Sequence, residues 1–143
     1  MKANAEIYGE VKAALDGWAD SYRQRDLARM LSHIAPDADM LMYGTGADEK
    51  RIGREAVGAQ AQRDWSQTDA SAFVLDQPAI SAAGNVAWAA ADAVFRVEMD
   101  GQEMAFPARF TGVFEKRDGR WLVVQAHFSL PAPQDEGESV PNK

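Results

Sequence analysis

Residues 85–130, NVAWAAADAVFRVEMDGQEMAFPARFTGVFEKRDGRWLVVQAHFSL, decide the fold of this chain. They consist of three runs rich in valine, alanine and aromatic residues, separated by Asp-Gly pairs at 100–101 and 118–119. Such runs favour β-strands, and Asp-Gly pairs between them are typical of tight hairpin turns. The preceding run SAFVLDQPAIS, at 71–81, has the same character. The pattern therefore predicts four consecutive antiparallel strands.

Helical periodicity replaces this pattern in the first half of the chain. The apolar residues that recur at three- or four-residue steps and predict a helix over about residues 4–24 are Ile7, Val11, Ala14, Trp18 and Tyr22. The sequence further predicts a short helix within 26–38, a strand at 38–44, a glycine-rich loop at 44–53 and a third helix over 54–65. Helices followed by a strand meander are typical of the α+β class. We therefore expect a strongly curved, mostly antiparallel sheet with three helices on one face.

The length, charge and hydropathy of the chain exclude several classes of protein. At 143 residues the chain fits a single domain, expected over 1–131, and its polar end, 132–143, is expected to be a disordered tail. The net charge of -7, with lysine and arginine scattered among acids, argues against a nucleic-acid partner. No stretch is apolar and long enough to span a membrane, so we expect no membrane partner.

Residues that bind metals or cofactors are scarce. The absence of cysteine excludes disulfides and thiolate ligands and is compatible with a reducing cytoplasm, so we expect a soluble cytoplasmic protein. His33 and His127 are the only histidines and lie far apart in the sequence, so we expect no metal site. The glycines at 44 and 46 are not followed by the lysine and serine of a phosphate-binding loop, and we expect no cofactor.

Polar residues on the last strands are the strongest candidates for a site. Counting outward from a two-residue turn places Asp92 opposite Arg109. A three-residue turn at 117–119 would place Arg109 opposite His127, whereas a two-residue turn would place it opposite Phe128. We prefer the three-residue turn because it gathers the polar residues on one sheet face. These residues are Arg109, Thr111, Gln125, His127 and Ser129.

Asp92, Arg109 and His127 would then form a row across three strands, the candidate catalytic group. A guanidinium keeps a neighbouring carboxylate ionised and disfavours the charged form of a neighbouring histidine. A neutral His127 could bind a ligand or move a proton. The same row could also be a polar network that fixes the strand register or a subunit contact, which is the commoner role of such rows, and both interpretations stay open.

The opposite face of these strands is apolar almost throughout. A sheet that is largely apolar must be covered on both faces, and three helices can cover only one of them. We therefore expect the second face to meet another copy of the chain in a homodimer. The pattern does not tell which face takes the helices.

Three segments of the sequence resemble the SnoaL-like group of the nuclear transport factor 2 superfamily. They are WADSYRQRDLARMLSHIAPDA at 18–38, YGTGADEKRIGREAV at 43–57 and ARFTGVFEKRDGRWLVVQAHFSLP at 108–131. The resemblance implies a cone-shaped sheet wrapped around helices, with a pocket inside and a homodimer outside. It does not imply one reaction, because the superfamily includes isomerases, polyketide cyclases, hydrolases and the association domain of a calmodulin-dependent kinase.

The ketosteroid isomerases of this superfamily provide a comparison of site residues. Met42 stands where those enzymes look to have a proton-abstracting aspartate, and Trp18 where they have an oxyanion-binding tyrosine. A methionine cannot accept a proton and an indole can donate only one hydrogen bond. The resemblance therefore does not extend to steroid-type isomerisation.

Aromatic residues are the candidates for the walls of a pocket inside the cone. They are Trp18, Tyr22, Tyr43, Trp65 and Trp88. Such walls suit a small hydrophobic or aromatic ligand, although core packing explains each residue equally well. We expect a small-molecule-binding homodimer. The alternatives are an isomerase, cyclase or lyase with His127 as general base, and an association module without its own substrate.

Overall fold

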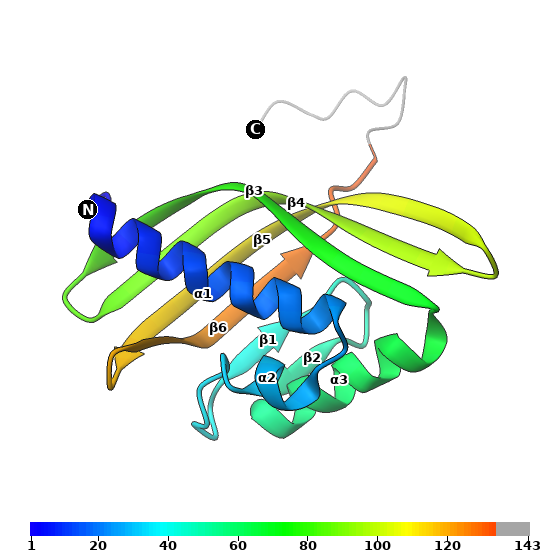
Figure 1. The fold of residues 1–143 in the computed structure, drawn as a ribbon, viewed down its shortest axis with the longest axis horizontal. Coiled ribbons are helices and arrows are strands. Elements are labelled where there is room, and N and C mark those ends of the chain that lie inside the picture. Colours follow the sequence, from blue (N-terminus) through cyan, green and yellow to red (C-terminus); the bar gives the residue numbers. More distant parts are fainter. Residues whose placement is uncertain (134–143) are drawn as a thin grey trace, which may run out of the picture.

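A six-stranded sheet carries three helices on one of its faces (Figure 1). The computed structural model describes residues 1–133; residues 134–143 of the expected tail lie outside this range. The elements in chain order are α1 (Ala5–Arg23), α2 (Leu27–Leu31), β1 (Leu41–Tyr43), β2 (Lys50–Ile52), α3 (Arg54–Gln67), β3 (Ala70–Ala83), β4 (Val86–Met99), β5 (Gln102–Arg117) and β6 (Arg120–Ser129). The strand order is β2-β1-β6-β5-β4-β3, and only the β1–β6 pair is parallel. The predicted α+β class and the long antiparallel meander are confirmed.

Two tight turns join β4 to β5 and β5 to β6. Both residues of each Asp-Gly pair have positive φ, 53° and 77° at 100–101 and 50° and 78° at 118–119. This conformation is that of a two-residue hairpin turn whose twist matches the strands. The first turn places Asp92 opposite Arg109, as predicted. The expected three-residue turn at 117–119 is wrong, because Arg117 pairs directly with Arg120.

A β-bulge in β6 then shifts the register by one residue. Phe114 pairs with Val123 and the next residue, Val113, pairs with Gln125, so Val124 is the extra residue. The predicted pairing of Arg109 with His127 is therefore wrong: Arg109 faces Ser129, and His127 faces Thr111. The bulge nevertheless leaves the polar residues of β5 and β6 on one face, as expected.

The helices cover the concave face of the sheet, and the core lies between the helices and the sheet. The buried residues of α1 are Val11, Leu15, Trp18, Ser21 and Tyr22. The Trp18 ring lies 5.4 Å from Phe73, 6.0 Å from Phe110 and 5.9 Å from Phe128, measured between ring centroids. Gly112 makes room beneath the Phe110 ring, since a Cβ at 112 would lie 2.6 Å from Phe110 Cζ. This packing fixes α1 across the sheet.

The edge of the sheet beside α3 is built from two three-residue strands. β1 lies parallel to β6, with Met42 beside Ala126. β2, which the sequence pattern missed, lies within the expected loop and pairs with β1. Its residues, Lys-Arg-Ile, are too few and too polar to show strand alternation. Within residues 1–133, no helix has the length and apolar character needed to cross a bilayer.

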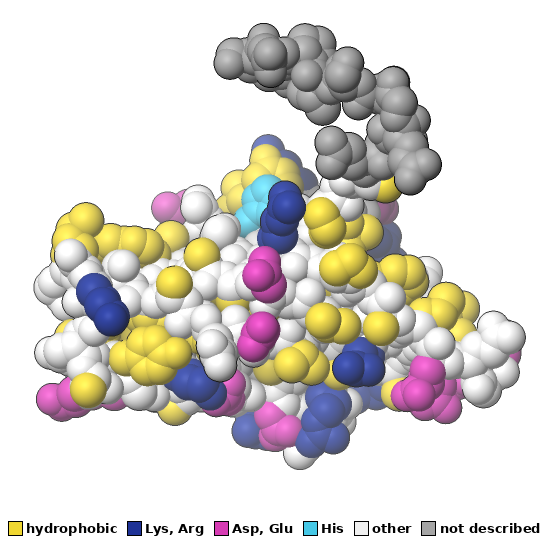
Figure 2. Space-filling view, turned by 90° about the horizontal axis from the view of Figure 1, so that it is seen from above, with side chains coloured by type: hydrophobic (Ala, Val, Ile, Leu, Met, Phe, Trp, Pro, Cys, Tyr) yellow, Lys and Arg dark blue, Asp and Glu magenta, His cyan; other side chains and the backbone are white. Residues whose placement is uncertain are grey.

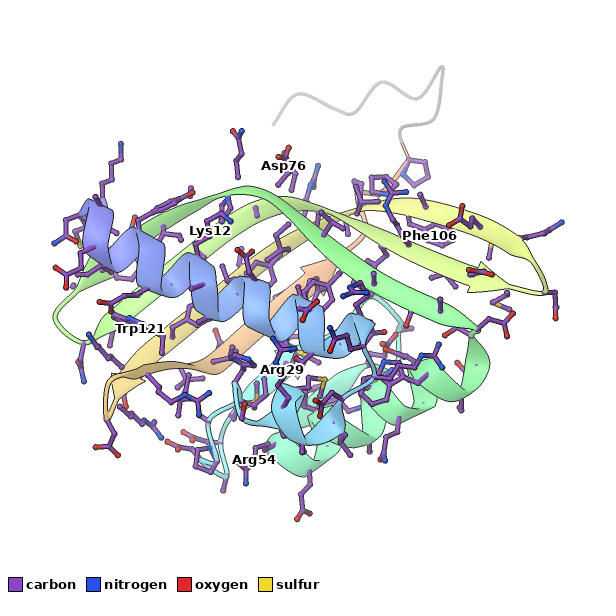
Figure 3. All side chains as sticks on the ribbon, in the orientation of Figure 1. Lys12, Arg29, Arg54, Asp76, Phe106 and Trp121 are labelled. Atoms are coloured by element: carbon purple, nitrogen blue, oxygen red, sulfur yellow. The ribbon has the colours of Figure 1, made fainter. Side chains whose placement is uncertain are left out.

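Glu10 connects α1 to the β5–β6 hairpin, where Trp121 lies beside the helix (Figure 3). Its Oε1 accepts hydrogen bonds from Trp121 Nε1 at 2.8 Å and from Lys116 Nζ at 3.0 Å. These donors, the Trp121 indole first, lower the pKa of Glu10 below its ordinary value. A carboxyl whose pKa is lower in the folded state stabilises the fold above its unfolded pKa, and this contribution is lost as the pH falls through the folded pKa.

We expect Glu10→Gln to lower the melting temperature at neutral pH, because the amide cannot supply an ionised acceptor. The difference from the wild type should shrink as the pH falls below about 4, where the unfolded glutamate is protonated. Circular dichroism melts across this pH range measure the difference. A melting-temperature difference that stays constant with pH would contradict this role of Glu10.

Candidate ligand-binding site

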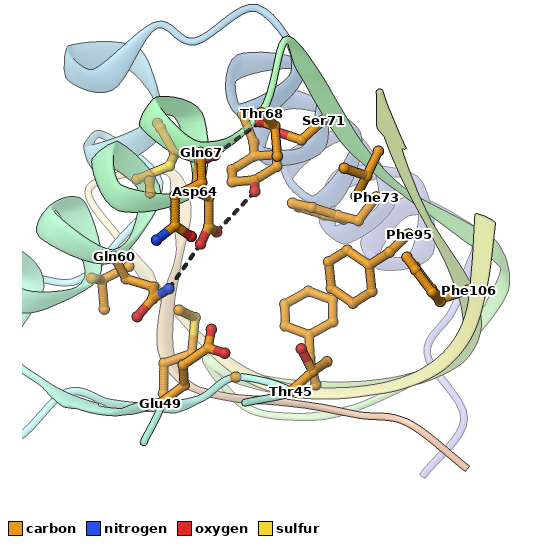
Figure 4. Close-up of a pocket in the computed structure, with 18 of the residues that line it drawn as sticks. Thr45, Glu49, Gln60, Asp64, Gln67, Thr68, Ser71, Phe73, Phe95 and Phe106 are labelled. Atoms are coloured by element: carbon orange, nitrogen blue, oxygen red, sulfur yellow. Dashed lines mark hydrogen bonds between the residues drawn. The ribbon is translucent and has the colours of Figure 1, made fainter. Parts of the chain in front are cut away.

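A cavity of about 310 Å³ opens between α3, the end of α1 and the sheet. Its two sides differ in chemistry, as Figure 4 shows. Aromatic side chains line one side: Trp18, Phe73, Phe95, Phe106 and Phe128. Polar side chains line the other: Glu49, Gln60, Asp64, Gln67 and Thr68, while Thr45 and Ser71 lie beside the rings. The cavity therefore fits a molecule with an apolar part and a polar end.

The aromatic side continues the core packing of the sheet. Phe128 lies 5.2 Å from Phe73 and 5.3 Å from Phe95, measured between ring centroids. Phe106, near the tip of the β4–β5 hairpin (Figure 3), is 41% exposed. The rings thus run from the buried centre of the protein out to solvent, which gives an apolar ligand a continuous surface to lie on.

Asp64 is the centre of the polar side. Its Oδ2 accepts a hydrogen bond from the Tyr22 hydroxyl at 2.9 Å, and its Oδ1 accepts one from Gln60 Nε2 at 2.8 Å. Burial, and then the negative charge of Asp64, raise the pKa of Tyr22 above its ordinary value, so Tyr22 stays protonated and donates. The bond from Tyr22 also joins α1 to α3.

The end of α3 is held in place by Arg25. Its guanidinium donates to the Trp65 carbonyl at 2.7 Å, to the Thr68 carbonyl at 3.0 Å and to Thr68 Oγ1 at 3.0 Å. Thr68 Oγ1 in turn donates to the backbone carbonyl of Asp64 at 2.8 Å. These bonds satisfy carbonyls that the helix end leaves unpaired, and they fix the turn of α3 that carries Asp64.

Glu49 reaches the cavity from the loop between β1 and β2. Its Oε2 accepts a hydrogen bond from the Gly46 amide at 2.6 Å. A Cβ at position 44 would lie 2.7 Å from Glu49 Oε1, and a Cβ at position 46 would overlap Oε2. The two glycines of the loop therefore make room for this carboxylate.

A comparison with protein families shows to which family the chain belongs. A sequence model of the SnoaL-like domain matches residues 11–133. The chain belongs to the SnoaL-like family. A comparison with curated proteins gives no match.

Three solved structures share the fold of this SnoaL-like domain at low sequence identity. A nuclear transport factor 2-like protein from Salmonella enterica is 21% identical, with a TM-score of 0.82 over 96% of this chain and 100% of its own. A proposed dehydratase of the same superfamily from Streptomyces avermitilis is 17% identical, with a TM-score of 0.79 over 87% and 96% of the two chains. A proposed calcium/calmodulin-dependent protein kinase II association domain from Xanthomonas campestris is 24% identical, with a TM-score of 0.76 over 91% and 94%. At these identities the similarity shows the fold alone.

The SnoaL-like domain places only two of the expected aromatic residues in the cavity wall. These are Trp18 and Tyr22. Trp65 packs on Tyr22 at 5.8 Å between ring centroids, outside the set of lining residues. Tyr43 and Trp88 lie on the convex face of the sheet, where the Tyr43 ring is 5.5 Å from the His127 ring.

The expected catalytic row also lies on the convex face of the SnoaL-like domain. Asp92, Arg109 and His127 are all exposed, and none of them lines the cavity. Asp92 and Arg109 are cross-strand neighbours, while His127 lies one row away beside Thr111. Asp76, which pairs with Asp92, points away from the helices (Figure 3). The row and the cavity are therefore separate features.

The polar residues of the cavity were not among the sequence candidates, although α3 carries a signal for two of them. Val57, Gln60, Ala61 and Asp64 are spaced three, four and seven residues apart, so they share one helix face. Polar side chains within an apolar stripe indicate a buried polar contact or a site. Glu49 has no such signal, because its position depends on the loop. Within residues 1–133, no group of three or more histidine, cysteine or acidic side chains is arranged to hold a metal ion.

Proposed function

We propose that this SnoaL-like protein binds a small hydrophobic or aromatic molecule in the cavity between α3 and the sheet. The observation that carries the proposal is the pairing of an aromatic side with a polar side built around Asp64. Apolar contact supplies most of the binding free energy in such sites, and a few polar groups fix the orientation of the ligand.

The geometry does not favour a reaction that uses His127 as general base. A general base must come within hydrogen-bond reach of the proton that it removes. His127 lies on the convex face, across the sheet from the ligand that we propose. We therefore do not infer an isomerase, cyclase or lyase that uses His127 from the similarity to the proposed dehydratase of Streptomyces avermitilis.

We further propose that the chain forms a homodimer through the convex face of the sheet, in a reducing cytoplasm as its lack of cysteine allows. None of the three helices covers this face (Figure 1). Figure 2 shows hydrophobic side chains on it, with acidic and basic side chains and a histidine among them. The apolar residues of this face include Val74, Trp88, Val94, Pro107, Val113 and Leu122. A second copy would remove these side chains from water.

Filling the cavity tests ligand binding. Ala61 is buried on α3 and lines the cavity, so Ala61→Trp should occupy it with an indole. We expect calorimetry to detect one-to-one binding of a neutral probe, 1-naphthalenemethanol, to the wild type and to detect none with this variant.

Ala59→Trp is the matched control, because Ala59 lies on the same helix and is exposed. It adds the same indole outside the cavity and should bind the probe like the wild type. Circular dichroism checks that both variants are folded. Wild-type affinity in a folded Ala61→Trp variant would contradict binding in this cavity.

A further inference from the structure

We propose that the ligand of this cavity is an organic cation: a protonated amine that carries an aromatic or other apolar group. The inference rests on the proposed binding function and adds the charge of the ligand to it. It is carried by three features of the cavity: the sign of its charges, the buried acceptor without a partner beside Asp64, and the aromatic side that faces them.

All the charges that line the cavity are negative. Glu49 and Asp64 are the charged residues among the described residues of the wall, and no lysine, arginine or histidine is among them. The nearby arginine side chains already bond to other groups of the protein. Arg63 pairs with Asp48 at 3.0 Å, and Arg25 donates to backbone carbonyls at the end of α3. The partners of the Asp64 carboxylate, Tyr22 and Gln60, are neutral.

The hydrogen bonds of Gln60 leave an acceptor without a partner. The Asp64 carboxylate accepts and does not donate, so Gln60 must turn its NH2 group toward Asp64 and its Oε1 away. Gln60 is 4% exposed, and its Oε1 has no hydrogen-bond partner within the described residues. A buried carbonyl without a partner destabilises the empty site, and a ligand donor would satisfy it.

Most of the donors beside Asp64 are already used. The Tyr22 hydroxyl and the Gln60 NH2 group bond to Asp64, and the Thr68 hydroxyl bonds to a backbone carbonyl. Next to them, Gln60 Oε1 and the free lone pairs of two carboxylates remain for a ligand, while Thr45, Gln67 and Ser71 supply neutral polar groups elsewhere in the wall. An ammonium group offers three N–H donors and a positive charge, which matches this set.

The aromatic side of the cavity suits the rest of such a molecule. Figure 4 shows Phe73, Phe95 and Phe106 across the cavity from Glu49, Gln60 and Asp64. Ring faces attract cations and cover apolar groups, so both parts of an apolar amine gain from this arrangement. An apolar carboxylate would bring a third negative charge beside two others, and the site should reject it.

Three naphthalene probes of similar size and different charge test the proposal: 1-naphthylmethylamine, which is protonated at neutral pH, 1-naphthalenemethanol and 1-naphthoate. We expect calorimetry to give the amine a dissociation constant at least about tenfold below that of the alcohol, with the carboxylate weakest. Raising the salt concentration should weaken the amine more than the alcohol, because salt screens only the charge interaction.

Charge-neutralising variants test whether the two carboxylates of the cavity cause the preference for the amine. Asp64→Asn and Glu49→Gln keep the shape of each side chain, and each should reduce the preference for the amine over the alcohol. Asp92→Asn is the matched control, because it removes the same charge on the convex face. It should leave the preference unchanged. Two cavity variants on different elements ensure that a folding defect in one does not decide the test.

The outcomes separate this inference from the proposed function. If the alcohol or the carboxylate binds as tightly as the amine, and Ala61→Trp still blocks binding, the cation inference is overturned and the cavity function stands. An equal effect of Asp92→Asn on the preference would also overturn it. If Ala61→Trp blocks none of the three probes, the cavity function fails and the inference fails with it.

Discussion

Replacing Phe110 by alanine should lower the free energy of unfolding by about 3–5 kcal/mol, the usual range for a fully buried phenylalanine. Phe110 is 1% exposed, and its ring lies 6.0 Å from Trp18 and 5.0 Å from Phe128. The glycine at 112 beneath the ring has no side chain that could move into the space, so the void should persist. Urea denaturation measures the loss as a lower midpoint at an unchanged slope.

Phe106→Ala is the matched control for this prediction. It removes the same ring from the same strand at a position that is 41% exposed. Its cost should be well below that of Phe110→Ala, because less surface returns to water and no enclosed void remains. Equal costs for the two variants would contradict the placement of the core between α1 and the sheet.

Replacing Val113 by glutamate should convert the proposed homodimer into a monomer. Val113 lies on the convex face of β5, between Trp88 of β4 and Gln125 of β6. A two-fold interface would receive the new charge twice, and a buried charge without a partner is costly. We expect the dissociation constant to rise at least about a hundredfold, which analytical ultracentrifugation measures across a concentration series.

Ala59→Glu provides the control, since it adds the same charge on the exposed side of α3. This variant should stay dimeric. A wild-type chain that sediments as a monomer at micromolar concentration would refute the dimer. A dimeric Val113→Glu variant would show that the convex face is not the contact.

The hairpins show how far the sequence predicts this fold. Asp-Gly turns and apolar runs predicted the meander, and counting from the turn at 100–101 gave the correct partner for Asp92. Counting failed in β6 because the bulge at Val124 inserts one residue. Residues 121–124 are all apolar, so the alternation that would reveal the shift is absent there.

The candidate site was harder to predict because tertiary contacts create it. Trp18 and Tyr22 were expected there as aromatic residues on the inner face of the first helix, inside the cone that the family resemblance implied. Asp64 belongs to the site because Tyr22, 42 residues earlier, donates to it, and no local pattern records that contact. The polar residues of β5 and β6 were the strongest candidates in the sequence because they interrupt apolar strands. Such a pattern indicates a polar sheet face, but it does not tell whether that face meets a ligand or another subunit.

The position of Glu49 has a consequence for how this family member could diverge. The Glu49 carboxylate lies against Gly44 and Gly46 in a loop, outside the packing around Phe110. Replacing Glu49 would therefore change the charge of the cavity at little cost to the stability of the fold. Asp64 is tied to two helices and is less free to vary. Descendants of such a protein could therefore acquire new ligands through residues 44–49 while the sheet and α1 remained as they are.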